Sequence, residues 1–327
     1  MSNKHPNLLT PSIGLGCMNL SHAYGSPVAE EEAVKALHEA FDMGYRHFDT
    51  ATLYGGGKNE LLVGKSLKHL RNELFLASKC GMAIVDGKKE INGRPDNIRQ
   101  QCENSLKRLV VEHIDLYYLH RKDPNVAIEE SVGALNDLVQ EGKIGAIGLS
   151  EVSAETLRKA HTEAPITALQ SEYSLWTRNP EIATLEATKE LGVTFVAFSP
   201  LARGYLTGAV KSAEELEQGD IRLNMPRFNS KHYPSNLALL NDFIGMANEI
   251  GCTPAQLALA WVLHQGDHVV AIPGTRFVKH MSDNLSATDV KLSESQLSDL
   301  NNMINQTNVS GTRYNDAQQK EIDTEEF

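Results

Sequence analysis

Four residues of this 327-residue chain could together donate a proton to a carbonyl compound: Asp49, Tyr54, Lys79 and His120. A free tyrosine has a pKa of about 10 and donates poorly near neutral pH. A lysine ammonium beside it lowers that pKa by stabilising the phenolate, and an aspartate paired with the lysine keeps the lysine charged and oriented. A neutral histidine can donate a hydrogen bond that directs a carbonyl oxygen. The set therefore suits acid catalysis on a carbonyl, but it contains no reductant.

These residues lie at, or just beyond, the ends of short apolar runs. Asp49, Lys79 and His120 end three successive runs, and Tyr54 follows Asp49 by five positions. Several runs are apolar on both faces, as strands of a buried parallel sheet are. We expect eight strands, at residues 13–17, 47–49, 74–79, 114–120, 144–150, 166–172, 193–199 and 269–273.

Amphipathic segments alternate with these runs. Val34, Leu37 and Phe41 recur at helical spacing, and residues 98–109 and 128–139 repeat the pattern with one apolar and one charged face. A strand–helix alternation repeated about eight times is compatible with an open doubly wound sheet or with a closed barrel.

The first strand distinguishes the two architectures. An open sheet usually carries a glycine-rich dinucleotide fingerprint there, but Gly14-Leu15-Gly16 is followed by Cys17-Met18-Asn19, so the third glycine is missing. The sequence therefore favours an α/β fold with a single (β/α)8 TIM barrel, in which the strand-end residues converge on the C-terminal face.

We expect residues 1–327 to form one domain, because no interdomain linker or internal repeat interrupts the alternation and barrels of this size are single domains. Two segments break the rhythm. Residues 207–236 are polar and contain proline, as a lid or a disordered loop would. Residues 308–327 form a polar, acidic C-terminal tail.

Composition limits the possible classes of function. The formal net charge is −11, which argues against a general nucleic-acid binder. No basic start followed by an apolar run marks residues 1–15 as a signal peptide, and no apolar stretch is long enough for a membrane span. The four cysteines are scattered and are expected to be reduced thiols. We therefore expect a cytoplasmic protein that binds neither nucleic acid nor membranes, and we predict no metal site.

The ordered motifs resemble those of the aldo-keto reductase family. Residues 44–51 read Gly-Tyr-Arg-His-Phe-Asp-Thr-Ala and are followed by Leu53-Tyr54-Gly55, as in the family signature. Five further motifs match in order between about residues 13 and 305: Leu119-His120, Gly148-Leu149-Ser150, Gln170-Ser171-Glu172-Tyr173, Phe198-Ser199-Pro200-Leu201 and Ile272-Pro273-Gly274-Thr275-Arg276. Residues 59–62 and 173–176 resemble the bacterial, plant and yeast branch near pyridoxal reductases and auxin-induced-type reductases.

The resemblance implies reduction of an aldehyde or ketone with NADPH, the product cofactor being NADP+. It implies Tyr54 as general acid, Lys79 and Asp49 as residues that tune it, and His120 as the residue that orients the carbonyl. The positions that it implies for cofactor binding are Gly16, Cys17, Met18, Asp49, Ser150, Gln170, Phe198, Ser199, Pro200, Leu201, Arg203, Gly204, Gly274, Thr275, Arg276, His280, Asp283 and Asn284.

Three positions depart from the common family pattern. Glu151 stands where an asparagine often helps to hold the nicotinamide carboxamide, Phe198 replaces a stacking tyrosine, and Ala202 replaces a glycine in the pyrophosphate loop. Thr275 and Arg276 are expected to open the last barrel helix, and a helix start with an arginine suits the extra phosphate of NADPH.

The substrate itself is not predicted, because loops at the barrel mouth determine it: residues 24–27, 86–93, 176–179 and the region from Thr207. We expect Tyr24, Trp176 and Phe228 to shape the substrate pocket, and the chain to be a monomer or a weak homo-oligomer. Two alternatives stay open. The same fold serves as a cofactor-binding regulatory subunit of potassium channels, and a bare barrel could be an isomerase or lyase that binds no cofactor.

Overall fold

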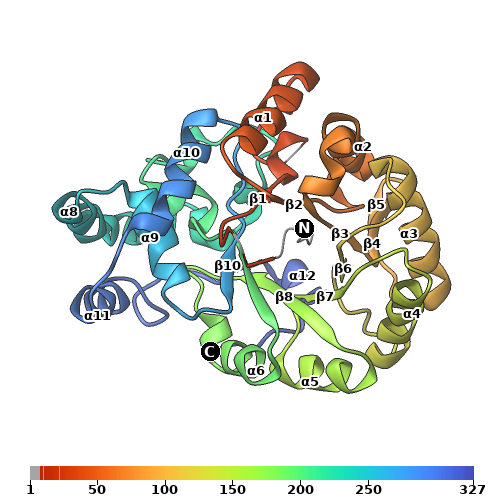
Figure 1. The fold of residues 1–327 in the computed structure, drawn as a ribbon. Coiled ribbons are helices and arrows are strands. Elements are labelled where there is room, and N and C mark those ends of the chain that lie inside the picture. Colours follow the sequence, from red (N-terminus) through yellow and green to blue (C-terminus); the bar gives the residue numbers. More distant parts are fainter. Residues whose placement is uncertain (1–7, 10, 22) are drawn as a thin grey trace.

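A computed structural model describes residues 8, 9, 11–21 and 23–327 of the chain (Figure 1). Residues 1–7 and 10, which belong to the segment expected to lack a signal peptide, lie outside the described part. Eight strands form one sheet with parallel pairing throughout: β1 (Leu15–Gly16), β2 (His47–Asp49), β3 (Phe75–Cys80), β6 (Leu116–Leu119), β7 (Ile147–Ser150), β8 (Ile166–Glu172), β9 (Thr194–Phe198) and β10 (Val269–Ala271).

The sheet closes on itself. Parallel bridges join Ile13 to Ala271 and Gly16 to Gly274, so the first strand lies beside the last. The predicted (β/α)8 barrel is therefore confirmed, and each strand coincides with one predicted run to within a few residues at either end.

Helices surround the barrel on its outer side (Figure 1). Those that follow successive barrel strands are α1 (Glu30–Asp42), α2 (Lys58–Leu67), α3 (Pro95–Leu109), α4 (Ile128–Gln140), α5 (Ala154–Glu163), α6 (Thr184–Leu191), α9 (Pro254–Leu263) and α10 (Val278–Ser286). Alpha-helices outside this ring are α7 (Tyr233–Ala238), α8 (Leu240–Ile250), α11 (Glu294–Met303) and α12 (Asp316–Gln319), and an antiparallel hairpin is formed by β4 (Met82–Val85) and β5 (Lys88–Ile91).

Two hydrophobic cores hold the layers together. The larger lies between strands and helices, and the smaller fills the barrel with Ala77, Tyr118, Ala168, Val196 and other strand residues. The inner core needs Gly148 on β7, because a Cβ there would lie 2.3 Å from Cδ1 of the Tyr118 ring. The barrel interior is thus packed with side chains, and a ligand has room only at an end.

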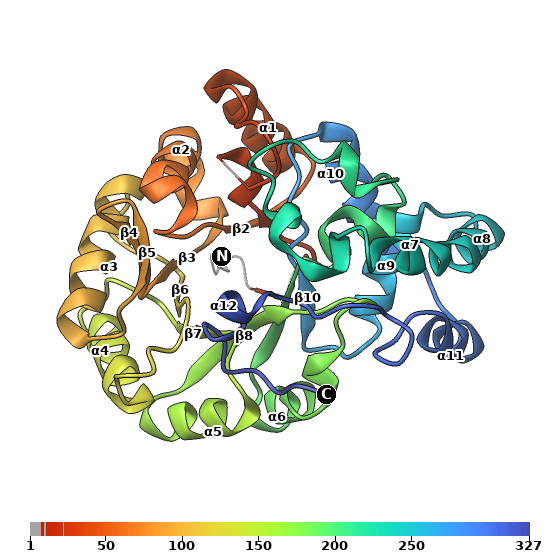
Figure 2. The ribbon, with the colours of Figure 1, turned by 180° about the vertical axis from the view of Figure 1, so that it is seen from behind.

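The segments that broke the strand–helix rhythm cover one end of the barrel. Residues 207–236 contain short 3-10 helices, including η7 (Ile221–Asn224) and η8 (Pro226–Phe228), and then α7, so the expectation of a disordered loop is wrong. The tail, with α12, runs across the strands at this end (Figure 2). Two tail residues, Arg313 and Tyr314, are buried there. The polar sequence of the tail did not indicate that they would be buried.

One helix boundary also differs from expectation. Thr275 and Arg276 precede α10, which begins at Val278, and the Thr275 hydroxyl accepts a hydrogen bond from the Phe277 backbone N–H.

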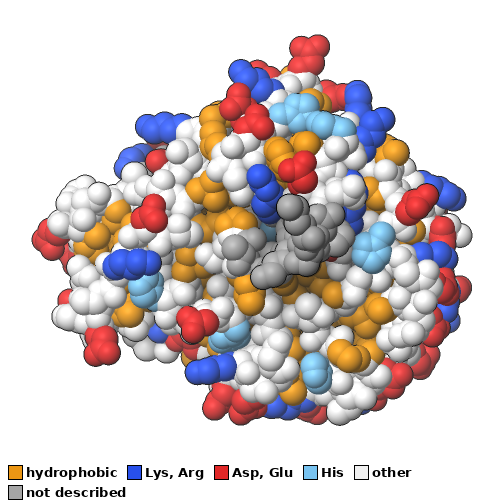
Figure 3. All heavy atoms as spheres, in the orientation of Figure 1, with side chains coloured by type: hydrophobic (Ala, Val, Ile, Leu, Met, Phe, Trp, Pro, Cys, Tyr) orange, Lys and Arg blue, Asp and Glu red, His pale blue; other side chains and the backbone are white. Residues whose placement is uncertain are grey.

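No described helix is long and apolar enough to cross a membrane. Acidic and basic side chains are interspersed on the face of the molecule shown in Figure 3.

Candidate active site

The alternation of side chains along the strands brings the chemical residues to the barrel mouth. Successive strand residues point to opposite faces, so a residue two positions beyond an inward residue also points inward. Ala77 and Tyr118 belong to the inner core, and Lys79 and His120 follow each of them by two positions. Gln170 follows Ala168 and Phe198 follows Val196 in the same way.

The four residues proposed for proton donation meet there. Lys79 Nζ forms a buried ion pair with Asp49 and donates to the Thr50 carbonyl at 2.8 Å. It also donates to the Tyr54 hydroxyl at 3.3 Å. The Tyr54 and His120 rings meet edge to face, with centroids 5.8 Å apart. The sequence hypothesis that these side chains gather at one place therefore agrees with the geometry.

Burial and charge together determine the protonation states. Burial raises the pKa of Tyr54, and Lys79 offsets only part of that effect, so the expected net lowering is not found. Burial, followed by the nearby Arg121 and Lys79 charges, holds the pKa of His120 well below its usual value. Burial alone would lower the pKa of Lys79, but Asp49 and Tyr54 raise it. At neutral pH Tyr54 is protonated, His120 is neutral and Lys79 is charged.

A glycine turn positions Tyr54. Gly55, Gly56 and Gly57 all have positive φ, between 58° and 90°, a region open to glycine at little cost. The turn is tied to the barrel by Asn59, whose amide donates to the Cys17 carbonyl at 2.8 Å and accepts from the Thr50 hydroxyl at 2.6 Å. The three glycines therefore form a defined turn beside the tyrosine.

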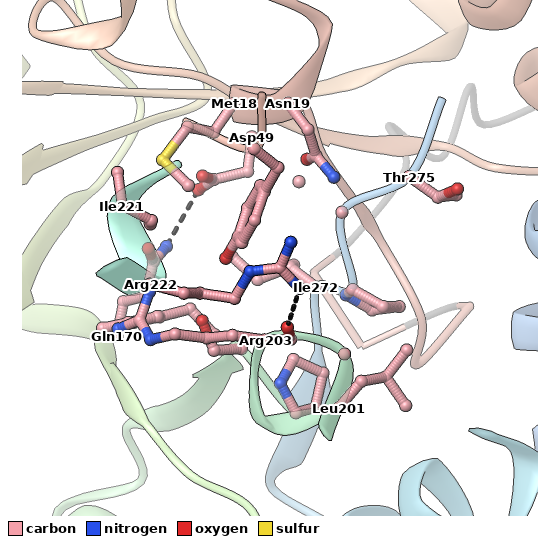
Figure 4. Close-up of a pocket in the computed structure, with 18 of the residues that line it drawn as sticks. Met18, Asn19, Asp49, Gln170, Leu201, Arg203, Ile221, Arg222, Ile272 and Thr275 are labelled. Carbon is pink, nitrogen blue, oxygen red and sulfur yellow. Dashed lines mark hydrogen bonds between the residues drawn. The ribbon is translucent and has the colours of Figure 1, made fainter. Parts of the chain in front are cut away.

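A cavity of about 620 Å³ extends from Asp49, Tyr54 and His120 across the mouth of the barrel (Figure 4). The Gln170 amide donates to Asp49 at 2.8 Å inside it, so Gln170 both lines the cavity and orients Asp49. The residues expected to bind cofactor that line the cavity are Gly16, Met18, Asp49, Ser150, Gln170, Phe198, Ser199, Pro200, Leu201, Arg203, Gly204, Gly274, Thr275, His280, Asp283 and Asn284.

The segment after β9 has an unusual backbone. Ser199, Ala202, Arg203 and Gly204 all have positive φ, although only the last is a glycine. Strained backbone of this type concentrates at functional sites. The Ala202 and Gly204 N–H groups donate to the Ser199 and Leu201 carbonyls, so the loop is a series of tight turns. Ala202, which replaces a glycine of the family pattern, adopts φ of 49°. Ala202 thus adopts the left-handed backbone conformation that favours the glycine common at this position.

Five predicted site residues do not line the cavity. One of them is Lys79, which is fully buried against Asp49. The buried Cys17 thiol lies near the Leu15 carbonyl, and Arg276 donates to the Ser26 carbonyl at the rim. Trp176 stacks on Tyr205 with centroids 4.1 Å apart, and Phe228 packs edge-on against Trp176. These two rings are buried against each other and Tyr205 and do not face the cavity, so the expectation that they shape the substrate pocket is wrong. Tyr24, by contrast, lines the cavity as expected.

Glu151 does not face the cavity either. Its carboxylate pairs with Arg313 of the tail and accepts from the Glu172 backbone N–H at 2.8 Å. Arg313 Nε also donates to Glu172 at 3.0 Å, and Arg203 donates to the same carboxylate at 2.7 Å. Although burial raises the pKa of Glu172, Arg203 and Arg313 lower it to about 2. We call Glu151, Glu172, Arg203 and Arg313 the buried ion cluster.

Sequence reasoning missed several cavity residues. Arg121 follows His120 directly, and its position after a strand end could have indicated it. Lys89, Ile221, Arg222 and Met225 were not singled out, although they lie in segments that the sequence places at the mouth, residues 86–93 and the region from Thr207. Nothing in the local pattern indicated Met82 or the residues that the tail brings in: Tyr314, Gln318, Glu321 and Ile322.

Metal binding finds no support in the part of the chain that the structure describes, where no group of three or more suitable side chains comes together. His264 and His268 stand four residues apart, a spacing that can bind a metal on a helix. Here His264 Nδ1 lies 2.7 Å from the Ala260 carbonyl, and His268 Nε2 lies 3.3 Å from the Leu185 carbonyl.

Comparison with known proteins shows which proteins this chain is similar to. Residues 12–305 match the model of the Aldo/keto reductase family. The chain is 45% identical over 306 residues to "Probable aldo-keto reductase 1" of Glycine max, covering 92% of this chain and 88% of that protein.

Solved structures show the same likeness. A glycerol dehydrogenase from Gluconobacter oxydans has a TM-score of 0.82 and 30% identity, over 89% of this chain and 90% of that one. An aldo/keto reductase from Klebsiella pneumoniae, solved with NADP and acetate, has a TM-score of 0.71 and 28% identity, over 93% and 94%. With the family model spanning most of its length, this chain belongs to the aldo/keto reductase family of oxidoreductases.

Proposed function

We propose that this protein reduces an aldehyde or ketone to an alcohol with NADPH, with Tyr54 as the general acid. The observation that carries the proposal is the contact of the protonated Tyr54 hydroxyl with Lys79 Nζ, at 3.3 Å, in the same cavity as His120. When bound, NADPH supplies the hydride. The chain's own residues supply position and the proton.

The residues along the cavity fit this cofactor. The positive-φ loop from Ser199 to Gly204 would hold the pyrophosphate, and the Phe198 ring would stack on the nicotinamide. Ser150 and Gln170 would hold its carboxamide, and Thr275, His280 and Asn284 lie where the adenosine end would bind. The structures of the Klebsiella pneumoniae reductase with NADP and with NADPH support the choice of cofactor.

Each catalytic side chain has one task. His120, neutral and buried, orients the carbonyl oxygen toward the Tyr54 hydroxyl. Tyr54 transfers its proton to that oxygen as the alkoxide charge develops, and the Lys79 ammonium stabilises the phenolate that results. Asp49 holds Lys79, and Gln170 holds Asp49, so the ammonium does not move during the transfer.

Replacement of the tyrosine hydroxyl tests this proposal. We expect Tyr54→Phe to lower kcat/KM for carbonyl reduction by about a hundredfold or more, which is the usual contribution of a general acid. Its NADPH affinity should stay within about twofold of that of the unchanged protein. Steady-state kinetics with a panel of soluble aldehydes, together with fluorescence titration of NADPH, would measure both. Near-normal turnover by this variant would remove Tyr54 from the reaction.

A further inference from the structure

The cations in and beside the catalytic end of the cavity differ in how their charges are balanced. Lys79 is paired with Asp49, and Lys89 on β5 is paired with Glu321 of the tail at 2.5 Å. Arg121 also lines the cavity, but among the described residues no carboxylate lies within ion-pair distance of its guanidinium.

Neutral groups satisfy Arg121 only in part. One terminal nitrogen donates to the His120 carbonyl at 2.6 Å and to the Ser150 hydroxyl at 3.2 Å. The Nε atom is buried and has no hydrogen-bond partner within the described part of the chain. The side chain is only partly buried and lines the cavity, so its charge is available there to an anion that enters.

Arg121 is also close to the reacting groups. Its charge lowers the pKa of both Tyr54 and His120, which places it within electrostatic range of the carbonyl position. The β4–β5 hairpin and the tail supply the surrounding wall through Met82, Lys89 and Ile322. An anionic substituent a few atoms from the reacting carbonyl could therefore reach the guanidinium.

We infer that Arg121 selects carbonyl substrates that carry an anionic group, a carboxylate or a phosphate, a short distance from the carbonyl carbon. This inference rests on the proposed reductase function and names the substrate class for it. An arginine fork suits the planar arrangement of two carboxylate oxygens and also binds phosphate oxygens. Arg121 is then a specificity residue that binds the part of the substrate that does not react.

A pair of substrates that differ only in charge tests the inference. We would measure kcat/KM with NADPH for 4-oxobutanoate and for its methyl ester. The unchanged protein should prefer the anion by about tenfold or more. In Arg121→Gln that preference should fall by about tenfold to a hundredfold, because hydrogen bonds to charged groups are worth roughly this much. Arg121→Lys should retain an intermediate preference because it keeps the charge and loses the fork.

Three controls make the result specific. Arg158→Gln, on the exposed face of α5 and paired with Glu190, should keep the unchanged protein's preference. The preference is taken as the ratio of kcat/KM for the anion to kcat/KM for the ester within each variant, so a general loss of activity in Arg121→Gln does not count toward it. Glyceraldehyde 3-phosphate compared with glyceraldehyde distinguishes the two anion types, because a preference confined to one pair identifies which anionic group Arg121 binds.

The outcomes are separable. If the unchanged protein reduces the ester and the anion equally well, or if Arg121→Gln keeps the preference, the inference is overturned while the reductase proposal stands. A loss confined to NADPH affinity would also overturn it, by assigning Arg121 to the cofactor. If no carbonyl compound in the set is reduced at all, the reductase proposal itself fails.

Discussion

At the scale of single residues, burial has a larger effect than charge on the proposed acid. Proximity of Lys79 to Tyr54 would lower the tyrosine pKa in water, yet the net direction in the protein is upward, because the low-dielectric site disfavours the phenolate more than one ammonium favours it. The raised pKa keeps the proton on Tyr54 until the carbonyl oxygen accepts it. Lys79 then contributes mainly after the transfer begins, by stabilising the phenolate.

These directions predict the pH dependence of reduction. Because the Tyr54 pKa is raised, Tyr54 loses its proton only above its ordinary pKa of about 10. Because the His120 pKa is lowered, His120 becomes protonated only well below its ordinary pKa of about 6.5. We therefore expect kcat/KM for an uncharged aldehyde, at saturating NADPH, to vary less than about threefold between about pH 6.5 and pH 9. Initial-rate measurements across this range would check it.

His120→Gln serves as the matched control for the pH profile. It removes the titrating group but keeps a hydrogen-bond donor, so it should lower the rate without changing the shape of the profile. An acidic limb near pH 6.5 in the unchanged protein that disappears in His120→Gln would show that His120 titrates in this range, contrary to the expectation.

At the scale of elements, the tail is held over the mouth by the buried ion cluster. Arg313 comes from the tail, Glu151 follows β7, Glu172 ends β8 and Arg203 lies in the loop after β9. The departure of Glu151 from the family pattern is explained by this arrangement. Its carboxylate does not substitute for a nicotinamide contact but pairs with an arginine that the tail supplies. Asp323 adds contacts to Lys122 and Thr156 farther along the tail.

Arg313→Met should strongly destabilise this arrangement. Removing one partner of a buried ion pair leaves the other charge buried alone, at a cost of roughly 3–5 kcal/mol. We expect either the free energy of unfolding to fall by this amount, or the tail to be released. Release would appear as faster amide exchange over residues 310–326. Urea denaturation and hydrogen exchange would measure these two quantities.

Two further variants identify the cause. Arg158→Met removes an exposed pair with Glu190 and should change stability by less than about 1 kcal/mol. Glu151→Gln combined with Arg313→Met should recover part of the loss, because no isolated carboxylate is left on Glu151. If Arg313→Met is no more destabilising than Arg158→Met, the cluster does not hold the tail.

At the scale of the whole molecule, segments far apart in sequence meet around one cavity. Its lining comes from β1, from the ends of β7 and β8, from the loops after β2, β6 and β9, from the β4–β5 hairpin, from the segment before α10 and from the tail. The overall negative charge does not oppose an anionic ligand there, because local arginines determine the field inside the mouth. A ligand bound across this cavity contacts the first and last barrel strands together and should stabilise the entire fold.

NADPH should therefore raise the free energy of unfolding by about 2.7 kcal/mol at a concentration of 100 Kd, as mass action requires. NADH, tested at the same concentration, should stabilise less if Arg276 or its neighbours bind the extra phosphate. Arg276 lies at the rim beside Thr275, within reach of that end. Arg276→Ala should reduce the NADPH effect and leave the NADH effect unchanged, as thermal unfolding would show. Equal losses with both cofactors would remove Arg276 from phosphate binding.

Much of the site could be read from local sequence because it lies on regular strands. Apolar runs predicted the eight strands, and the polar residues that end them, such as Lys79 and His120, were predicted to converge because parallel strands of a barrel present their carboxyl ends on one face. Their exact inward direction follows from alternation with Ala77 and Tyr118.

Only the tertiary structure decided what surrounds those residues. Trp176 and Phe228 are aromatic residues of mouth loops, and sequence alone could not distinguish a cavity wall from a layer behind it. The tail looked like a solvated acidic segment, because local polarity does not reveal that Arg313 finds Glu151 and Glu172 more than 140 positions away. Strand ends are determined by local periodicity, whereas the environment of each side chain depends on long-range packing, which no local pattern encodes.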